Sequence, residues 1–292
     1  MRCGRSARRR SAGWIALWIA ASAGPGSAET VVVTAAADNT LIESASGAFS
    51  NGAGAVFFVG HTSQLADGRR RGLVRFDVAA ALPPGAIVTA ALLRLTHTQS
   101  THPQPIEIGL HRVLAAWGEG ASVASGGGGA PSAPGDATWI HTYYDDAFWE
   151  APGGDFVAEV SSVQVVGDAG PVTWPSSPGA VADVQAWLDD ASANHGWLLL
   201  GGEEARETSK RFASREAQEP DTQPQLVIDY ELPCVQLDLD GPSHALCHAY
   251  CDALQCDAPD TKASPHACAR VEQQFLLRSG RETLRCERPP GD

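Results

Sequence analysis

The sequence has few charged residues, and basic residues are the scarcer kind. Charged residues make up 19 % of the 292 positions, while 30 glycines and 19 prolines supply many turn formers. This composition disfavours long solvated helices and favours short elements joined by turns. Beyond residue 28, only 16 basic residues stand against 34 acidic ones, a net charge of −18. Such a surface repels phosphate backbones, which excludes nucleic acid as an expected partner.

The sequence also lacks an apolar run of membrane-spanning length. Residues 12–21 are apolar, follow five arginines and lead to Gly26-Ser27-Ala28, which is the pattern of a secretory signal peptide. An uncleaved anchor is the alternative, but a span needs about 20 apolar residues. We therefore expect residues 1–28 to be removed and the protein to be secreted, periplasmic or extracellular, with no membrane span. Arg8-Arg9-Arg10 leaves a twin-arginine export route open.

Cysteine is absent from residues 29–233 and frequent after them. Six cysteines lie within a short C-terminal segment: Cys234, Cys247, Cys251, Cys256, Cys268 and Cys286. An even number in a short exported segment predicts three disulfides. A zinc site is the alternative, because three histidines lie among these cysteines. The contrast divides the mature chain into residues 29–231 and a Cys-rich module of residues 232–292.

We expect this Cys-rich module to be a small α-hairpin. Apolar residues recur at helix spacing between Leu246 and Leu254, and Ser264-Pro265 predicts the start of a second helix that ends at Gly280. Antiparallel packing would join the cysteines as Cys251–Cys268, Cys247–Cys286 and Cys234–Cys256. Six cysteines allow fifteen pairings, so other connectivities stay open. The sequence does not indicate a partner for this module.

The first domain has the pattern of strands joined by turns. Residues 73–78 and 106–113 alternate apolar and polar side chains, as half-buried strands do. One short amphipathic helix is indicated between Val181 and Leu188. The fold class is therefore mostly β, an antiparallel sandwich of jelly-roll type with one short helix. The loop 122–134 contains four consecutive glycines, and we expect it to be a flexible insertion.

Short motifs in this domain occur in an order that is similar to a known family. They are Asp38-Asn39-Thr40-Leu41, Arg71-Gly72-Leu73-Val74-Arg75-Phe76-Asp77, Leu82-Pro83-Pro84-Gly85-Ala86, Trp117-Gly118-Glu119, Ala137-Thr138-Trp139 and Phe212-Ala213-Ser214-Arg215-Glu216. Together they resemble the DNRLRE domain, the group that includes carbohydrate-binding module family 96. The resemblance implies a secreted bacterial β-sandwich that binds an acidic polysaccharide such as alginate. No hydrolase or lyase domain accompanies it here.

Two groups of residues are candidates for polysaccharide binding. The first is an aromatic segment in which Tyr143 and Tyr144 are expected to be exposed and to stack on sugar rings, with His141 beside them. The second is basic and could form a groove for uronates if its members share one sheet face, the alternative being surface ion pairs. Trp139 and Trp149, in the same aromatic segment, are further candidates that are more typical of core packing. The candidates in the basic group are Arg71, Arg75 and Arg211.

No motif for catalysis or for a firm metal site is present. The sequence has no Gly-x-Ser-x-Gly elbow, no His-Glu-x-x-His helix and no phosphate loop, so we expect a non-catalytic protein. No cofactor is expected apart from calcium, for which Asp38 and Asp155 are candidates without the fixed spacing of an EF-hand. A structural or adhesive surface protein is the alternative from another class. Polysaccharide lyase or hydrolase chemistry is a further alternative, with His141 as a lyase acid or base.

Overall fold

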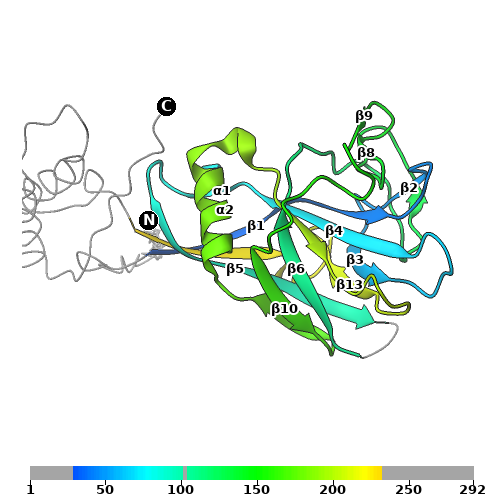
Figure 1. The fold of residues 1–292 in the computed structure, drawn as a ribbon. Helices are drawn as coiled ribbons and strands as arrows, with labels where there is room; N and C mark the ends of the chain where they lie inside the picture. Colours follow the sequence, from blue (N-terminus) through cyan, green and yellow to red (C-terminus); the bar gives the residue numbers. More distant parts are fainter. Residues whose placement is uncertain (1–28, 101–103, 232–292) are drawn as a thin grey trace, which may run out of the picture.

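The computed structural model describes residues 29–100 and 104–231, and these are mostly β-structure (Figure 1). Strands account for 42 % of the described residues and helices for 11 %, and every paired strand runs antiparallel to its neighbour. The predicted mostly β, antiparallel class is therefore confirmed. The expected signal peptide of residues 1–28 and the Cys-rich module of residues 232–292, with its three disulfides, lie outside the described residues.

Ten strands form one connected system of antiparallel pairs in the described residues. Nine of them follow one another in a single path of neighbours, and β11 lies off this path, paired with β5. They are β1 (Glu29–Ile42), β3 (Val56–His61), β4 (Arg69–Phe76), β5 (Ile87–Ser100), β6 (Ile106–Arg112), β10 (Ser162–Val166), β11 (Gly170–Trp174), β12 (Trp197–Leu200), β13 (Lys210–Ala213) and β14 (Gln225–Glu231).

The described residues also form smaller sheets, helices and turns outside the ten-stranded system. Two two-stranded sheets pair β2 with β7 and β8 with β9. The bounds of the smaller elements are β2 (Phe49–Ser50), β7 (Ala130–Pro131), β8 (His141–Tyr143), β9 (Ala147–Phe148), α1 (Val78–Ala81), α2 (Pro178–Asp189), η1 (Ala191–Ala193) and η2 (Pro220–Thr222).

The long strand β1 connects two layers of a sandwich-like arrangement. Its first part, from Glu29 to Thr34, pairs with β14, and its second part, from Ala35 to Ile42, pairs with β4. A register shift between Ala35 and Ala37 marks the change of partner. Bulges of this kind bend a strand, which lets one strand serve both layers.

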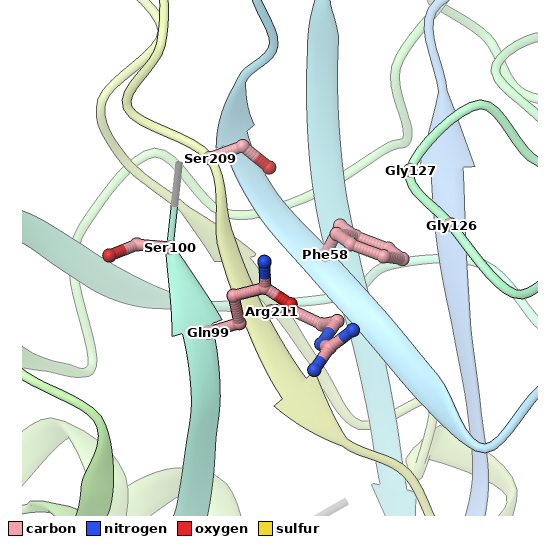
Figure 2. A pocket seen from close by; sticks show the side chains of 7 residues that line it. All are labelled: Phe58, Gln99, Ser100, Gly126, Gly127, Ser209 and Arg211. Atoms are coloured by element: carbon pink, nitrogen blue, oxygen red, sulfur yellow. The ribbon is translucent and has the colours of Figure 1, made fainter. Parts of the chain in front are cut away.

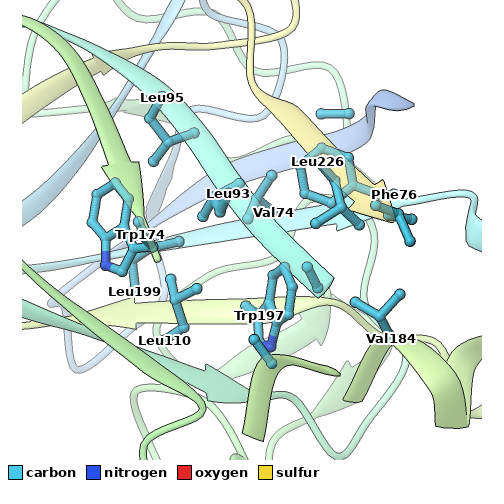
Figure 3. Packing of buried hydrophobic residues seen from close by; sticks show 14 of the residues in the cluster. Val74, Phe76, Leu93, Leu95, Leu110, Trp174, Val184, Trp197, Leu199 and Leu226 are labelled. Atoms are coloured by element: carbon cyan, nitrogen blue, oxygen red, sulfur yellow. The ribbon is translucent and has the colours of Figure 1, made fainter. Parts of the chain in front are cut away.

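The core lies between the layers and is rich in tryptophan (Figure 3). Trp174, Trp187 and Trp197 are fully buried, and the rings of Trp187 and Trp197 meet edge to face at 4.7 Å. The indole N–H of Trp174 donates to the Ile108 carbonyl at 2.8 Å, and that of Trp197 donates to Asp183 at 2.8 Å. Large rings fill the space between the sheets while two of their polar atoms stay bonded.

The predicted amphipathic helix is α2. Its N-cap is Ser177, whose hydroxyl accepts from the N–H of Ala180 at 3.1 Å, and Pro178 occupies the first helical position. It buries Val184 and Trp187 against the sheets. The structure adds the four-residue α1 and two 3-10 turns, which are too short to show a helical period in the sequence. None of the helices in residues 29–100 and 104–231 is long and apolar enough to cross a membrane.

Candidate functional site

A small pocket lies on the outer side of β3, β13 and the end of β5 (Figure 2). Its volume is about 260 Å³, and it is lined by Phe58, Gln99, Ser100, Gly126, Gly127, Ser209 and Arg211. Ligand pockets commonly measure roughly 300–1,000 Å³, so this pocket suits a single ring or charged group of a larger ligand.

Strand register assembles the floor of the pocket. Arg211 on β13 pairs with Phe58 on one side and with Gln99 on the other, so the three side chains form a row across the sheet. The neighbours Phe57 and Phe212 are buried in the core with their rings 5.5 Å apart. Because successive side chains of a strand point to opposite faces, Phe58 and Arg211 face away from the core.

Among the described residues that line the pocket, Arg211 alone carries a charge. Its Nε donates to Thr98 Oγ1 at 2.9 Å, and that hydroxyl donates to the Arg211 carbonyl at 3.1 Å. In the described part of the chain, no carboxylate forms an ion pair with Arg211, and its two terminal nitrogens have no hydrogen-bond partner. These N–H groups are therefore available to an anionic group in the pocket.

The glycine-rich loop forms the opposite wall. A Cβ added to Gly127 would lie 3.4 Å from the ring of Phe58, so the loop backbone rests on this ring. The Gly127 carbonyl accepts a hydrogen bond from Nε of Arg70 at 2.6 Å. The segment that we expected to be a flexible insertion thus makes defined contacts at this point.

The structure does not bring the three candidate arginines together. Arg71 forms a bidentate pair with Glu203 at 2.7 and 2.9 Å and lies 4.8 Å over the ring of Trp139. Arg75 lies on β4 opposite Ala37 and near His195, whose pKa is lowered by burial and by this guanidinium. Only Arg211 lines the pocket. Within the described residues, Arg71, Arg75 and Arg211 therefore do not share one groove, and Arg71 has the ion pair that the sequence left open as the alternative.

The aromatic segment folds into the β8–β9 hairpin. Trp139 and Trp149 are buried in a second core cluster, so both are packing residues. His141 is only 4 % exposed, its Nδ1 lies 2.9 Å from Thr138 Oγ1, and burial lowers its pKa. Tyr143 is 37 % exposed, as expected. Tyr144 is half-buried, and its ring meets that of His141 edge to face at 5.1 Å.

Phe148, at the end of the same hairpin, was not a sequence candidate, yet it is 63 % exposed. Its ring lies 4.5 Å from that of His141. The sequence signal was its place beside Trp149, but two neighbouring aromatic residues do not reveal which of them faces outward.

The candidate calcium ligands have structural partners and do not lie together. Asp38 is fully buried, and its Oδ2 accepts from the N–H of Arg215 at 2.7 Å. Asp155 accepts from the N–H groups of Glu150 and Ala151 at 2.8 and 3.0 Å, which is the geometry of a turn residue. No group of three or more histidine, cysteine or acidic side chains within the described ranges is arranged to hold a metal ion.

Four of the six motifs that carry the family resemblance meet in one partly buried polar network. The amide of Asn39 donates to the Glu119 carbonyl at 2.9 Å and to the Ala137 carbonyl at 3.3 Å. Glu119 in turn binds the guanidinium of Arg215 at 2.6 and 2.8 Å, and accepts from the N–H of Asp38 at 2.9 Å. Four segments that are far apart in the sequence are thereby joined, so these motif residues stabilise the fold and do not line the pocket.

Comparison of the chain with family models and with curated proteins gives no match in either case. The pocket is therefore the best guide to function.

Proposed function

We propose that this protein is a secreted, non-catalytic carbohydrate-binding module that holds an acidic polysaccharide at the Arg211 pocket. The observation that carries the proposal is a guanidinium without a carboxylate partner in the described residues, facing a pocket on a protein that is otherwise strongly acidic. A planar guanidinium fork matches the two oxygens of a uronate carboxylate.

The other lining groups suit a sugar. Phe58, which is 8 % exposed, offers a small apolar surface to the C–H face of a pyranose ring. Gln99, Ser100 and Ser209 offer donors and acceptors for hydroxyl groups. The pocket volume of about 260 Å³ accommodates one residue of a longer chain. One such subsite is consistent with modest affinity, with the rest of the polysaccharide lying in solvent.

The wider context supports the same proposal. The sandwich-like fold fits a jelly roll of the carbohydrate-binding kind, and residues 1–28 have the pattern of a secretory signal peptide. Among the residues that the structure describes, the pocket lining includes no carboxylate and no histidine that could serve as a general acid or base. The buried position of His141 gives no support to lyase chemistry at the hairpin.

The first prediction is that Arg211→Gln abolishes the preference for acidic glycans. Hexasaccharides of mannuronate, guluronate and galacturonate, with a neutral glucan hexasaccharide, would be titrated calorimetrically against the mature chain. Loss of a charged hydrogen-bond pair corresponds to about tenfold or more in Kd. We expect Arg211→Gln to weaken binding of the preferred hexauronate by this factor and to leave the fold intact.

Arg94→Gln provides the matched control. It removes the same charge from an exposed position on β5 that does not line the pocket, so affinity should stay unchanged. A Tyr143→Ala, Tyr144→Ala double variant tests the hairpin as a rival site. Binding that survives Arg211→Gln and is lost in the double variant would place the site on the hairpin. No binding to any glycan at millimolar concentration would favour the structural or adhesive alternative.

A further inference from the structure

We propose that Arg70 is the positioning residue of the pocket: from inside the protein, its guanidinium fixes the Gly126–Gly127 wall opposite Arg211. This inference rests on the proposed function of that pocket. Arg70 does not line the pocket and cannot reach a ligand there, since its side chain is enclosed by protein.

Arg70 is unusual because it is a buried cation bound to neutral oxygens. It is 1 % exposed. Its Nε donates to the Gly127 carbonyl at 2.6 Å, Nη1 donates to the carbonyls of Asp67 and Arg69 at 2.8 and 2.7 Å, and Nη2 donates to Gln64 Oε1 at 3.2 Å. No carboxylate in the described ranges lies within ion-pairing distance of it.

Such an arrangement is costly to maintain. Burial lowers the pKa of Arg70 to about 10, so the guanidinium still carries its charge at neutral pH. An apolar side chain at this position would avoid the loss of hydration that a buried cation suffers. What the guanidinium provides instead is attachment: it ties the loop that contains Gln64 and Asp67, and the glycine-rich loop, to strand β4.

The glycine-rich loop is anchored at both ends: the N–H of Ala124 donates to Asn51 Oδ1 at 2.6 Å, and β7 pairs with β2. Residues 126–128 between these anchors have few contacts. Among the described residues, nothing lies within 4 Å of a Cβ built on Gly126 or on Gly128, and the atoms nearest to a Cβ built on Gly127 belong to the ring of Phe58. Within the loop, the Gly129 N–H donates to the Gly126 carbonyl at 3.2 Å, which closes a turn but does not anchor it. The bond from Arg70 to Gly127 is therefore the hydrogen bond that joins residues 126–128 to the rest of the described protein, between the anchors on either side.

Figure 2 shows the consequence for the pocket: Phe58 lies between Arg211 and the loop with Gly126 and Gly127. The distance between the Gly126–Gly127 wall and the guanidinium of Arg211 then depends on where Arg70 holds the Gly127 carbonyl. A wall that is already in place does not have to be ordered when the ligand binds, and this lowers the cost of binding. Arg70 thus determines affinity without touching the sugar.

The test compares Arg70→Lys with Arg69→Lys. Lysine keeps the charge at position 70 but lacks the fork that reaches both loops. The same exchange at Arg69, whose half-exposed side chain pairs with Glu43 at 3.5 Å, leaves the loop contact untouched. Each mature chain would be titrated with the mannuronate hexasaccharide, and amide hydrogen exchange would be followed at residues 126–129 and in β5 and β14.

We expect Arg70→Lys to bind about tenfold more weakly, as for one lost charged hydrogen bond, and to exchange faster at residues 126–129 only. Arg69→Lys should match the unmodified chain in both measurements. A folded Arg70→Lys protein with unchanged affinity and unchanged loop exchange would overturn the proposal. Uniformly faster exchange in β5 and β14 as well would also overturn it, because Arg70 would then be a general fold-stabilising residue.

Two further measurements keep the inference testable. Arg70→Gln removes the buried charge altogether and serves if the lysine variant does not fold. If neither variant folds, the Nε–H resonance of Arg70 in the unmodified protein is expected to shift on adding the hexasaccharide, and an unmoved resonance refutes the proposal. Absence of binding by the unmodified chain would instead count against the proposed function, while the exchange comparison would still decide whether Arg70 holds the loop.

Discussion

At the level of single residues, buried charges in this fold are bound mainly by backbone groups. Arg70 donates to three backbone carbonyls, the fully buried Lys210 donates from Nζ to the Gln104 carbonyl at 2.7 Å, and Asp38 accepts from the N–H of Arg215. Backbone partners compensate part of the lost hydration and fix loops at the same time. The polar residues that look most functional in the sequence are therefore chiefly structural.

Asp38 is one of the described residues with a buried side-chain atom that lacks a hydrogen-bond partner. Its Oδ1 is buried without a hydrogen-bond partner, and burial raises the pKa of Asp38 well above its usual value. Because the folded-state pKa is raised, the unfolded chain loses this proton first as the pH rises. The contribution of Asp38 to stability is therefore greatest below the ordinary value of 3.8 and is lost as the pH rises through the folded-state pKa.

We predict that Asp38→Asn stabilises the protein at neutral pH. Asparagine can still accept from the N–H of Arg215 and carries no charge to bury, so the free energy of unfolding should rise by about 1–3 kcal/mol. The gain should vanish when the pH falls below the ordinary Asp pKa. Urea denaturation from pH 3 to pH 8 measures both effects.

Asp155→Asn is the control for this prediction. Both oxygens of Asp155 accept backbone N–H groups, and an amide can replace only one of them, so a loss of stability is expected. Equal effects of the two substitutions would contradict the role assigned to the buried charge of Asp38.

At the level of elements, local period and capping were readable from the sequence, but pairing was not. The alternation of residues 73–78 and 106–113 correctly indicated β4 and β6, and the spacing from Val181 to Leu188 indicated α2. Nothing local shows that β1 pairs with β14 and then with β4, because the bulge that changes its partner is a tertiary feature.

The pocket could not be predicted for a related reason. Its floor combines Phe58, Gln99 and Arg211 from three strands, and only strand register brings them into one row. The run Val56-Phe57-Phe58-Val59 is apolar throughout, so it does not tell which phenylalanine faces outward. Arg211 was a candidate by charge alone, and the sequence did not separate it from Arg71, which is paired with Glu203.

The N-cap residue of α2, Ser177, is expected to stabilise the protein. Ser177 accepts from the N–H of Ala180 and also donates to the Ser161 carbonyl, which ties the start of the helix to the residue before β10. Ser177→Ala should lower the free energy of unfolding by about 1–2 kcal/mol, measured by urea denaturation. Ser177→Thr keeps the hydroxyl and should retain most of that stability. An alanine variant as stable as the unmodified chain would show that the cap contributes nothing.

At the level of the whole molecule, the charge distribution opposes the ligand that the pocket favours. The chain beyond residue 28 carries a net charge of −18, and an acidic polysaccharide is a polyanion. Approach is therefore repulsive at long range and attractive only near Arg211. Added salt screens the long-range repulsion more than the attraction at Arg211, because the contact with Arg211 is partly enclosed and short-ranged.

This balance predicts an unusual salt dependence. The Debye length falls from about 30 Å at 0.01 M to about 8 Å at 0.15 M ionic strength, so long-range repulsion weakens over this range. Affinity for a hexauronate should stay level or rise by up to about threefold, the effect of roughly 0.6 kcal/mol of relieved repulsion. Calorimetric titrations at the two salt concentrations measure the change, with the uronate monomer, which carries one charge, as the control for the local contact alone. A steep loss of hexauronate affinity with salt is the behaviour of many distributed cationic contacts, and it would refute a single Arg211 subsite.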